Sequence, residues 1–215
     1  MRPRTAGLVL VLVLLLCVNW IVSDCAAAPR EQQIPILSVT TGTQPTGTVT
    51  YIIAAFEERA DRNGLSLRFH EQPGRFSPMA KTAAEQAIRQ AAASLGLSTD
   101  SWNVELKVPY EGVTVSGDSL SAMVGVTIAA MAQGKHVPTG YVLTGTVTDD
   151  GEIGPVGGVS LKVQAARAAK LRRVLVPDQQ TPVGSGQQFP ARLEISPVRS
   201  VPEALDALTE SQPVK

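Results

Sequence analysis

The chain has 215 residues and a balanced formal charge, with 19 Lys and Arg against 19 Asp and Glu. This length is sufficient for one domain with a real hydrophobic core. The balanced charge lacks the basic excess that is typical of nucleic-acid-binding proteins, so no nucleic-acid partner is expected. Aromatic residues are only 4% of the chain, and the remaining composition favours an α/β or α+β domain with small-residue packing.

The first 28 residues indicate an export signal. Arg2 and Arg4 precede an almost wholly apolar stretch from Gly7 to Val22, which is near the lower limit for a transmembrane helix. The alanines that follow Cys25 resemble a signal-peptidase site. An uncleaved membrane anchor, a cleaved signal peptide and lipidation of Cys25 remain open. In each case we expect the domain to lie outside the cytoplasm, membrane-anchored or secreted, because the basic end stays inside.

The cysteines and histidines do not predict a metal or cofactor. Cys17 and Cys25 both lie in or beside the leader, so the rest of the chain has neither a disulfide nor a thiol nucleophile. His70 and His136 are far apart in sequence and have no cysteine or carboxylate cluster beside them. We interpret them as surface residues, and expect neither a metal site nor a cofactor.

The remaining chain is predicted to be one α+β domain over residues 36–210, joined to the leader by a short polar linker at residues 29–35. Its first helix starts at Ser77 with proline in the first turn, and ends near Gly96. A second helix should run from Leu120 to Gly134. The predicted strands include 36–40, 47–55, 65–69, 103–108 and 141–148, and a capping box of Ser200 and Glu203 starts the last helix.

Ser121 stands where the loop from Gly117 to Leu120 enters a helix that is apolar all round. At such a position the hydroxyl should be accessible, and the first backbone N–H groups should be free of intrahelical partners. Together with the helix dipole, these N–H groups could stabilise an oxyanion. Ser119 is a rival nucleophile by proximity.

Lys162 lies where a helix should have no lysine. At 100° per residue it falls inside the apolar arc of its helix, between Ala166 and Ala169. Its stem could follow the core while the ammonium reaches water. Alternatively, burial could lower its pKa towards neutrality, which is what a serine nucleophile without a histidine base requires.

The order and spacing of three motifs resemble the proteolytic domain of the Lon proteases, which use a Ser–Lys dyad. Asp118 and Ser121-Ala122 stand in the family pattern Lys-Asp-Gly-Pro-Ser-Ala-Gly. Leu143–Thr146 matches the family's Thr-Gly-Glu strand, and Val156–Lys162 matches its Ile-Gly-Gly-x-Lys-Glu-Lys, in which the second lysine is catalytic. The resemblance is good from about Val104 to Leu208 and implies a Lon-type fold, similar to ribosomal protein S5 domain 2.

The resemblance implies that Ser121 is the nucleophile and Lys162 the base of a serine endopeptidase acting on peptides or unfolded protein segments. Thr144 matches a residue that orients the lysine, although it could equally be a β-branched strand residue. Asp118 could gate the site or cap the Ser121 helix. The oligomeric state stays open, with a homo-oligomer as one possibility.

Five residues depart from the family pattern and leave the rate and the substrate preference open: Lys107, Leu120, Met123, Thr146 and Ser160. They favour one alternative, a catalytically weakened binding module that kept the fold, whereas the retained Ser121 and Lys162 argue against it. Another alternative is a small-molecule kinase of the mevalonate kinase type, but Asp118 would repel a phosphate. The chain has no Gly-x-x-x-x-Gly-Lys-Ser/Thr loop, so we expect its peptidase activity to be independent of ATP.

Overall fold

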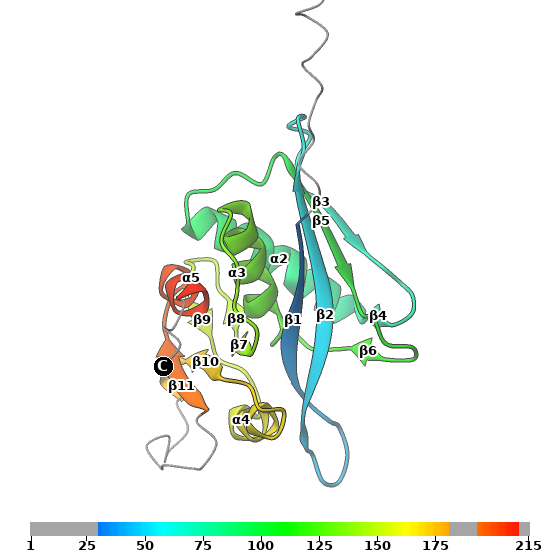
Figure 1. Cartoon of the computed structure of the whole chain (residues 1–215), viewed down its shortest axis with the longest axis vertical. Coiled ribbons are helices and arrows are strands. Elements are labelled where there is room, and N and C mark those ends of the chain that lie inside the picture. The colour runs from blue at the N-terminus through cyan, green and yellow to red at the C-terminus, as the bar shows by residue number, and fades with distance from the viewer. Residues whose placement is uncertain (1–29, 181–192, 211–215) are drawn as a thin grey trace, which may run out of the picture.

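A computed structural model describes residues 30–180 and 193–210 (Figure 1). The predicted leader, with Cys17 and Cys25, lies outside the described residues. In the ranges that are described, none of the helices is long and apolar enough to cross a membrane.

The first half of the domain forms a four-stranded sheet in the order β1-β2-β5-β3. The strands β1 and β2 form a long antiparallel hairpin, β5 is antiparallel to β2, and β3 is parallel to β5. The bounds of these strands are β1 (Arg30–Val39), β2 (Gly47–Glu58), β3 (Ser66–Phe69) and β5 (Trp102–Lys107).

Residues 30–35, which the sequence suggested as part of a linker, belong to β1. One of the polar residues of this segment, Gln32, is buried. Its amide donates to Val137 O (2.8 Å) and accepts from Val137 N (3.4 Å), so the polar group is satisfied inside the fold. The linker interpretation is therefore wrong for these residues. They form a strand, and the Gln32 amide binds the Val137 backbone where a linker side chain would bind water.

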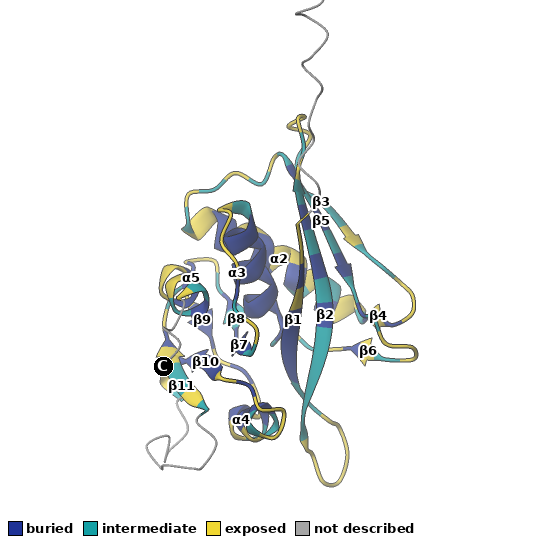
Figure 2. Ribbon diagram, viewed as in Figure 1, coloured by how far each residue is buried: buried dark blue, intermediate teal, exposed yellow. Residues whose placement is uncertain are grey.

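Two helices cover one face of this sheet, α2 (Pro78–Ser94) and α3 (Ser121–Ala132) (Figure 1). As predicted, Ser77 caps α2, and its hydroxyl accepts from Ala80 N at 3.2 Å. The two helices pack very closely, since a Cβ added at Gly125 would lie 2.5 Å from the Ala87 carbonyl oxygen. This close packing buries every residue of α3 from Ser121 to Met131 (Figure 2).

The second half contains a parallel three-stranded sheet in the order β11-β10-β7, with helices α4 and α5. The bounds are β7 (Tyr141–Leu143), α4 (Val159–Ala168), β10 (Arg173–Pro177), β11 (Glu194–Val198) and α5 (Val201–Thr209). The described residues also form short elements: β4 (Arg75–Phe76), β6 (Thr114–Val115), β8 (Thr146–Val147), β9 (Ile153–Gly154) and the 3-10 helix η1 (Asp178–Gln180).

The strand predicted at residues 141–148 is divided in two because the chain changes partners at Thr144 and Gly145. Thr144 N donates to Leu175 O in β10 (3.0 Å), whereas Gly145 N donates to Ser119 O (3.2 Å) in the loop before α3. Beyond this break, β8 pairs with β9 instead of continuing beside β10. The break therefore places Thr144 between the second sheet and the start of α3.

One continuous core joins both halves, and the predicted mixed fold of strands and helices is confirmed (Figure 2). The predicted cap of α5 is also present, since Ser200 Oγ accepts from Glu203 N (3.4 Å). The Glu203 carboxylate, however, accepts from Arg199 N (2.8 Å) and not from the N-cap residue, so the capping box is displaced by one residue.

Candidate active site

Ser121 is the first residue of α3, as its position after the loop predicted. Its accessibility was predicted wrongly, because the residue is only 2% exposed. The reason is tertiary: α3 is buried from Ser121 to Met131, and the loop that precedes it is bound to the chain at Gly145 through Ser119 O. That loop turns at Gly117, whose φ of +89° lies in the left-handed region.

The first two N–H groups of α3 are not free, contrary to the sequence expectation. Ser121 N donates to Asp118 O at 2.9 Å, and Ala122 N donates to Gly145 O at 3.1 Å. A tight turn and the neighbouring chain at Gly145 thus satisfy donors that a helix start leaves without intrahelical partners. Neither group is available to an oxyanion in this arrangement.

Lys162 lies in the first half of α4 and is only 2% exposed. Its Nζ donates to Thr144 Oγ1 at 3.1 Å, and Thr144 is fully buried. The ammonium therefore does not reach water along the stem, and the alternative of a solvated lysine is wrong. The apolar arc predicted the buried side of α4 correctly, since Val159, Val163 and Ala166 are buried with Lys162, but it left open whether the amine reaches water.

Burial lowers the pKa of Lys162 from its ordinary value of 10.5 to about 8. The cause is desolvation, since a charged ammonium loses more hydration than a neutral amine when it enters the protein interior. The negative charge of Asp118 opposes the shift by favouring the protonated form. A substantial fraction of this amine is therefore neutral at mildly alkaline pH, which a solvated lysine is not.

Two hydrogen bonds connect the elements that carry the candidate residues. Ala122, next to Ser121, donates to Gly145, and the neighbouring Thr144 accepts from Lys162. The structure thus brings the start of α3, the end of β7 and the first half of α4 together. Asp118 belongs to the same cluster, because its charge acts on Lys162 while its carbonyl group binds Ser121 N.

The structure excludes one of the two interpretations of Asp118. The N-cap residue of α3 is Leu120, and no side chain makes a capping hydrogen bond there. Asp118 is exposed, and its carboxylate makes none of the hydrogen bonds that a helix cap would make. Its interpretation as a gate stays a prediction.

Comparison with known proteins assigns this arrangement to a family. Residues 40–210 match the model of the Lon protease (S16) C-terminal proteolytic domain. The chain belongs to this family.

Individual relatives agree with this assignment to the Lon proteolytic-domain family. The chain is 29% identical to the archaeal Lon protease of Archaeoglobus fulgidus over 64% of this chain and 22% of that protein. It is 30% identical to the Lon protease of Mycolicibacterium smegmatis over 76% of this chain and 21% of that protein. It is 33% identical to the Lon protease of Halothermothrix orenii over 45% of this chain and 13% of that protein. The match thus spans 13% to 22% of the length of these relatives, and the family supports a serine peptidase.

Two of the residues that depart from the Lon pattern have a definite structural place. Met123 is fully buried, and its Sδ accepts from Leu143 N at 3.2 Å, which satisfies the N–H group just before Thr144. Thr146 stands directly beside Gly154, where an added Cβ would lie 2.4 Å from Thr146 Oγ1. Both departures are accommodated around the candidate Lon-type site without displacing Lys162 from Thr144.

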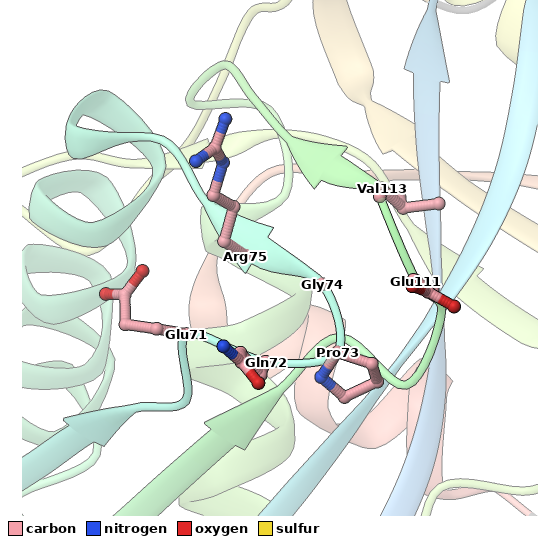
Figure 3. Close-up of a pocket in the computed structure, with 8 residues that line it drawn as sticks. Glu71, Gln72, Pro73, Gly74, Arg75, Glu111 and Val113 are labelled. Atoms are coloured by element: carbon pink, nitrogen blue, oxygen red, sulfur yellow. The ribbon is translucent and has the colours of Figure 1, made fainter.

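A cavity of about 490 Å³ lies away from the four candidate residues. Figure 3 shows its two walls, with Glu71 to Arg75 on one side and Glu111 to Val113 on the other. None of its lining residues carries the predicted chemistry. In the two described ranges, no group of three or more His, Cys, Asp or Glu side chains could hold a metal ion. His70 Nε2 instead lies 2.9 Å from a carboxylate oxygen of Glu105.

The sequence did not predict two glycine contacts that support the site. Gly145 binds the loop before α3 through its N–H group and the start of α3 through its carbonyl group. Gly47, at the start of β2, touches the backbone of α4 beside Lys162. The only sequence signal for either was a small residue beside a strand, which is too common to identify a contact.

Proposed function

We propose that this domain is a serine peptidase in which Ser121 is the nucleophile and Lys162 the general base. The observation that carries the proposal is the buried Lys162 amine, which is bound to Thr144 and whose pKa is lowered to about 8. General-base catalysis is most effective when the pKa of the base is close to the working pH. The match to the Lon proteolytic-domain family supports the same reaction.

In this mechanism the neutral Lys162 amine takes the proton of Ser121 Oγ, and the oxygen attacks the carbonyl carbon of the scissile peptide bond. The resulting ammonium returns that proton to the amine that leaves as the C–N bond breaks. Water then hydrolyses the ester on Ser121, with Lys162 again accepting a proton. Throughout these steps Thr144 Oγ1 accepts from the Lys162 Nζ and limits the positions that the amine can take.

Substrate binding must also open the turn before α3. The Ser121 side chain is buried, and the Ser121 N–H group is held by Asp118 O. We therefore propose that a bound peptide displaces this turn, exposes the hydroxyl and frees the N–H group for the oxyanion. Asp118 is exposed, and Gly117 already has the left-handed conformation of a turn.

The proposed substrates are peptides and unfolded protein segments, and the proposed reaction does not use ATP. The 215 residues contain no phosphate-binding Gly-x-x-x-x-Gly-Lys-Ser/Thr loop, so this chain lacks the usual means of coupling nucleotide hydrolysis to unfolding. Unfolded segments fit an active site without an unfolding device, because local opening of a compact substrate is rare. From the apolar N-terminal stretch we further propose an extracytoplasmic location.

A catalytically weakened binding module on the same fold is the second candidate. Two observations favour it: Ser121 is buried, and its N–H group is already bonded. A kinase of the mevalonate kinase type receives less support, because the exposed Asp118 carboxylate would repel a phosphate at the start of α3.

Peptide cleavage by a leaderless protein and two serine variants distinguishes these possibilities. The protein is incubated with an unfolded protein substrate, beside Ser121→Ala and the matched variant Ser119→Ala. We expect cleavage by the parent and by Ser119→Ala, and none by Ser121→Ala. Loss of activity only in Ser119→Ala would show that the wrong serine has been assigned. Binding without cleavage by the parent would favour the binding module.

A further inference from the structure

The last residue pair of the β1–β2 hairpin lies against the helix that carries Lys162. Val39 and Gly47 are paired across the two strands, at the end where the hairpin opens into its loop. Figure 1 shows α4 beside this end of the hairpin, and β2 makes extensive contact with α4. The pair therefore lies far from Lys162 in sequence but next to its helix in space.

Gly47 touches the backbone of α4 directly. A Cβ added at this position would lie 2.0 Å from Leu161 O, 2.6 Å from Leu161 C and 3.0 Å from the Ala165 Cβ. The first two atoms belong to the helix backbone and cannot rotate away as a side chain could. Any residue larger than glycine would thus force the hairpin end and α4 apart at the turn that contains Leu161, the neighbour of Lys162.

Val39 fixes the beginning of the same turn. A Cβ added at Gly158 would lie 2.7 Å from Val39 Cγ2, so the Val39 side chain fills the space beside this residue. Gly158 precedes α4 with a φ of +69°, and its carbonyl group accepts from Lys162 N at 3.0 Å. One cross-strand pair therefore contacts both ends of the helical turn that leads to Lys162.

We propose that Val39 and Gly47 are positioning residues for Lys162. They hold the first turn of α4 in the position from which the Lys162 amine reaches Thr144 and stays away from water. The catalytic part of this inference rests on the proposed peptidase function. The geometric part concerns only where the amine lies, and can be measured in an inactive protein.

Displacement of α4 has two consequences for Lys162. The amine moves away from Thr144 Oγ1, with which it makes its 3.1 Å hydrogen bond, and it gains contact with water. Hydration favours the protonated form, so the pKa of Lys162 should rise towards 10.5 and less neutral amine is present near pH 8. Misplacement of a catalytic group by about 1 Å is sufficient to slow a reaction by about 10²-fold.

The first test compares Gly47→Ala with Thr40→Ala in the same hairpin. Thr40 is exposed and bonds only within the loop, where its Oγ1 accepts from Thr46 N at 3.0 Å, so its loss weakens the hairpin without touching α4. We expect Gly47→Ala to lower kcat by about 10- to 100-fold with little change in KM, since Ser121 and the loop before it are unchanged. Thr40→Ala should keep both parameters. Equal kcat in the parent and a folded Gly47→Ala would overturn the proposal.

The second test measures the pKa of the Lys162 amine by NMR titration of protein with ¹³C-labelled lysine side chains. The signal of Lys162 is identified by its absence from the spectrum of Lys162→Met. The titration midpoint should rise towards 10.5 in Gly47→Ala and stay unchanged in Thr40→Ala. If Gly47→Ala does not fold, Val39→Ala replaces it, because that variant removes the contact with Gly158 and adds no bulk. An unchanged midpoint in the folded variant overturns the positioning role. A raised midpoint in a protein whose parent cleaves nothing would support positioning while refuting the peptidase function.

Discussion

Replacement of Lys162 by methionine should abolish peptide cleavage and yet make the domain more stable at pH 7. Methionine keeps the length and the apolar stem of the side chain but removes the charge that the interior disfavours. The difference between pKa values of 10.5 and about 8 corresponds to ~3 kcal/mol that the folded parent loses at pH 7. Loss of the hydrogen bond to Thr144 Oγ1 costs about 1 kcal/mol, which leaves a net gain of about 2 kcal/mol.

The sign of the pH dependence follows from the depressed pKa of a cationic group. Between pH 8 and 10.5 the unfolded chain binds more protons at this lysine than the folded chain does, so the parent gains stability as the pH rises. Below pH 8 the full penalty is present, and near pH 10.5 it has almost disappeared. The advantage of Lys162→Met should therefore be largest at pH 7, fall to zero as the penalty shrinks, and reverse near pH 10.5, where the lost hydrogen bond of about 1 kcal/mol is the larger effect.

Urea unfolding of both proteins at pH 7 and at pH 10.5 measures this difference directly. Other titrating groups are common to the two proteins, so their contributions cancel in the comparison. The reasoning is refuted if Lys162→Met is less stable than the parent at pH 7, or if the difference between the two proteins does not depend on pH. The first result would mean that the ammonium is well solvated or well paired.

Four further results are expected. The rate of peptide cleavage by the parent should increase with pH through an apparent pKa of about 8, and an increase only near 10.5 would show that Lys162 is not the base. Thr144→Val keeps the shape of the side chain but removes the acceptor for Lys162, so kcat should fall about tenfold while KM is unchanged. If kcat of this variant equals that of the parent, Thr144 contributes only packing. An unfolded substrate should be cut faster than its folded form, at a rate that ATP does not alter, and stimulation by ATP would contradict the proposed mechanism. A reporter that works only in the cytoplasm should be inactive when fused after Lys215, and an active reporter would refute export.

The local pattern of the sequence was sufficient to predict most elements and the buried side of α4. Ser77 and Ser200 marked helix starts through their own capping chemistry, which depends on neighbouring residues in the chain. The arc of Val159, Val163 and Ala166 predicted the buried side of α4 because helical geometry fixes which side chains share a face. These features are decided within a few residues, and so they can be read directly from sequence.

Local pattern was not sufficient where a distant contact changed the outcome. Gln32 looks like a linker residue until Val137, more than 100 positions away, satisfies its amide. Ser121 looks accessible, but its side chain is buried, its N–H group binds Asp118 O, and the next N–H group, that of Ala122, binds Gly145 O. In both cases a contact with a distant part of the chain takes part: Val137 for Gln32, and Gly145 for the residue next to Ser121.

The sequence by itself thus determined which residues carry the candidate chemistry: a serine at a helix start and a lysine in an apolar arc. Only the tertiary structure decided that Thr144 meets the lysine, because β7 ends there and the chain leaves the sheet towards α3. It alone also set the pKa of Lys162, since desolvation depends on every element packed around the amine. The same holds for Gly47, whose role comes from a contact between β2 and α4 that neither segment encodes alone.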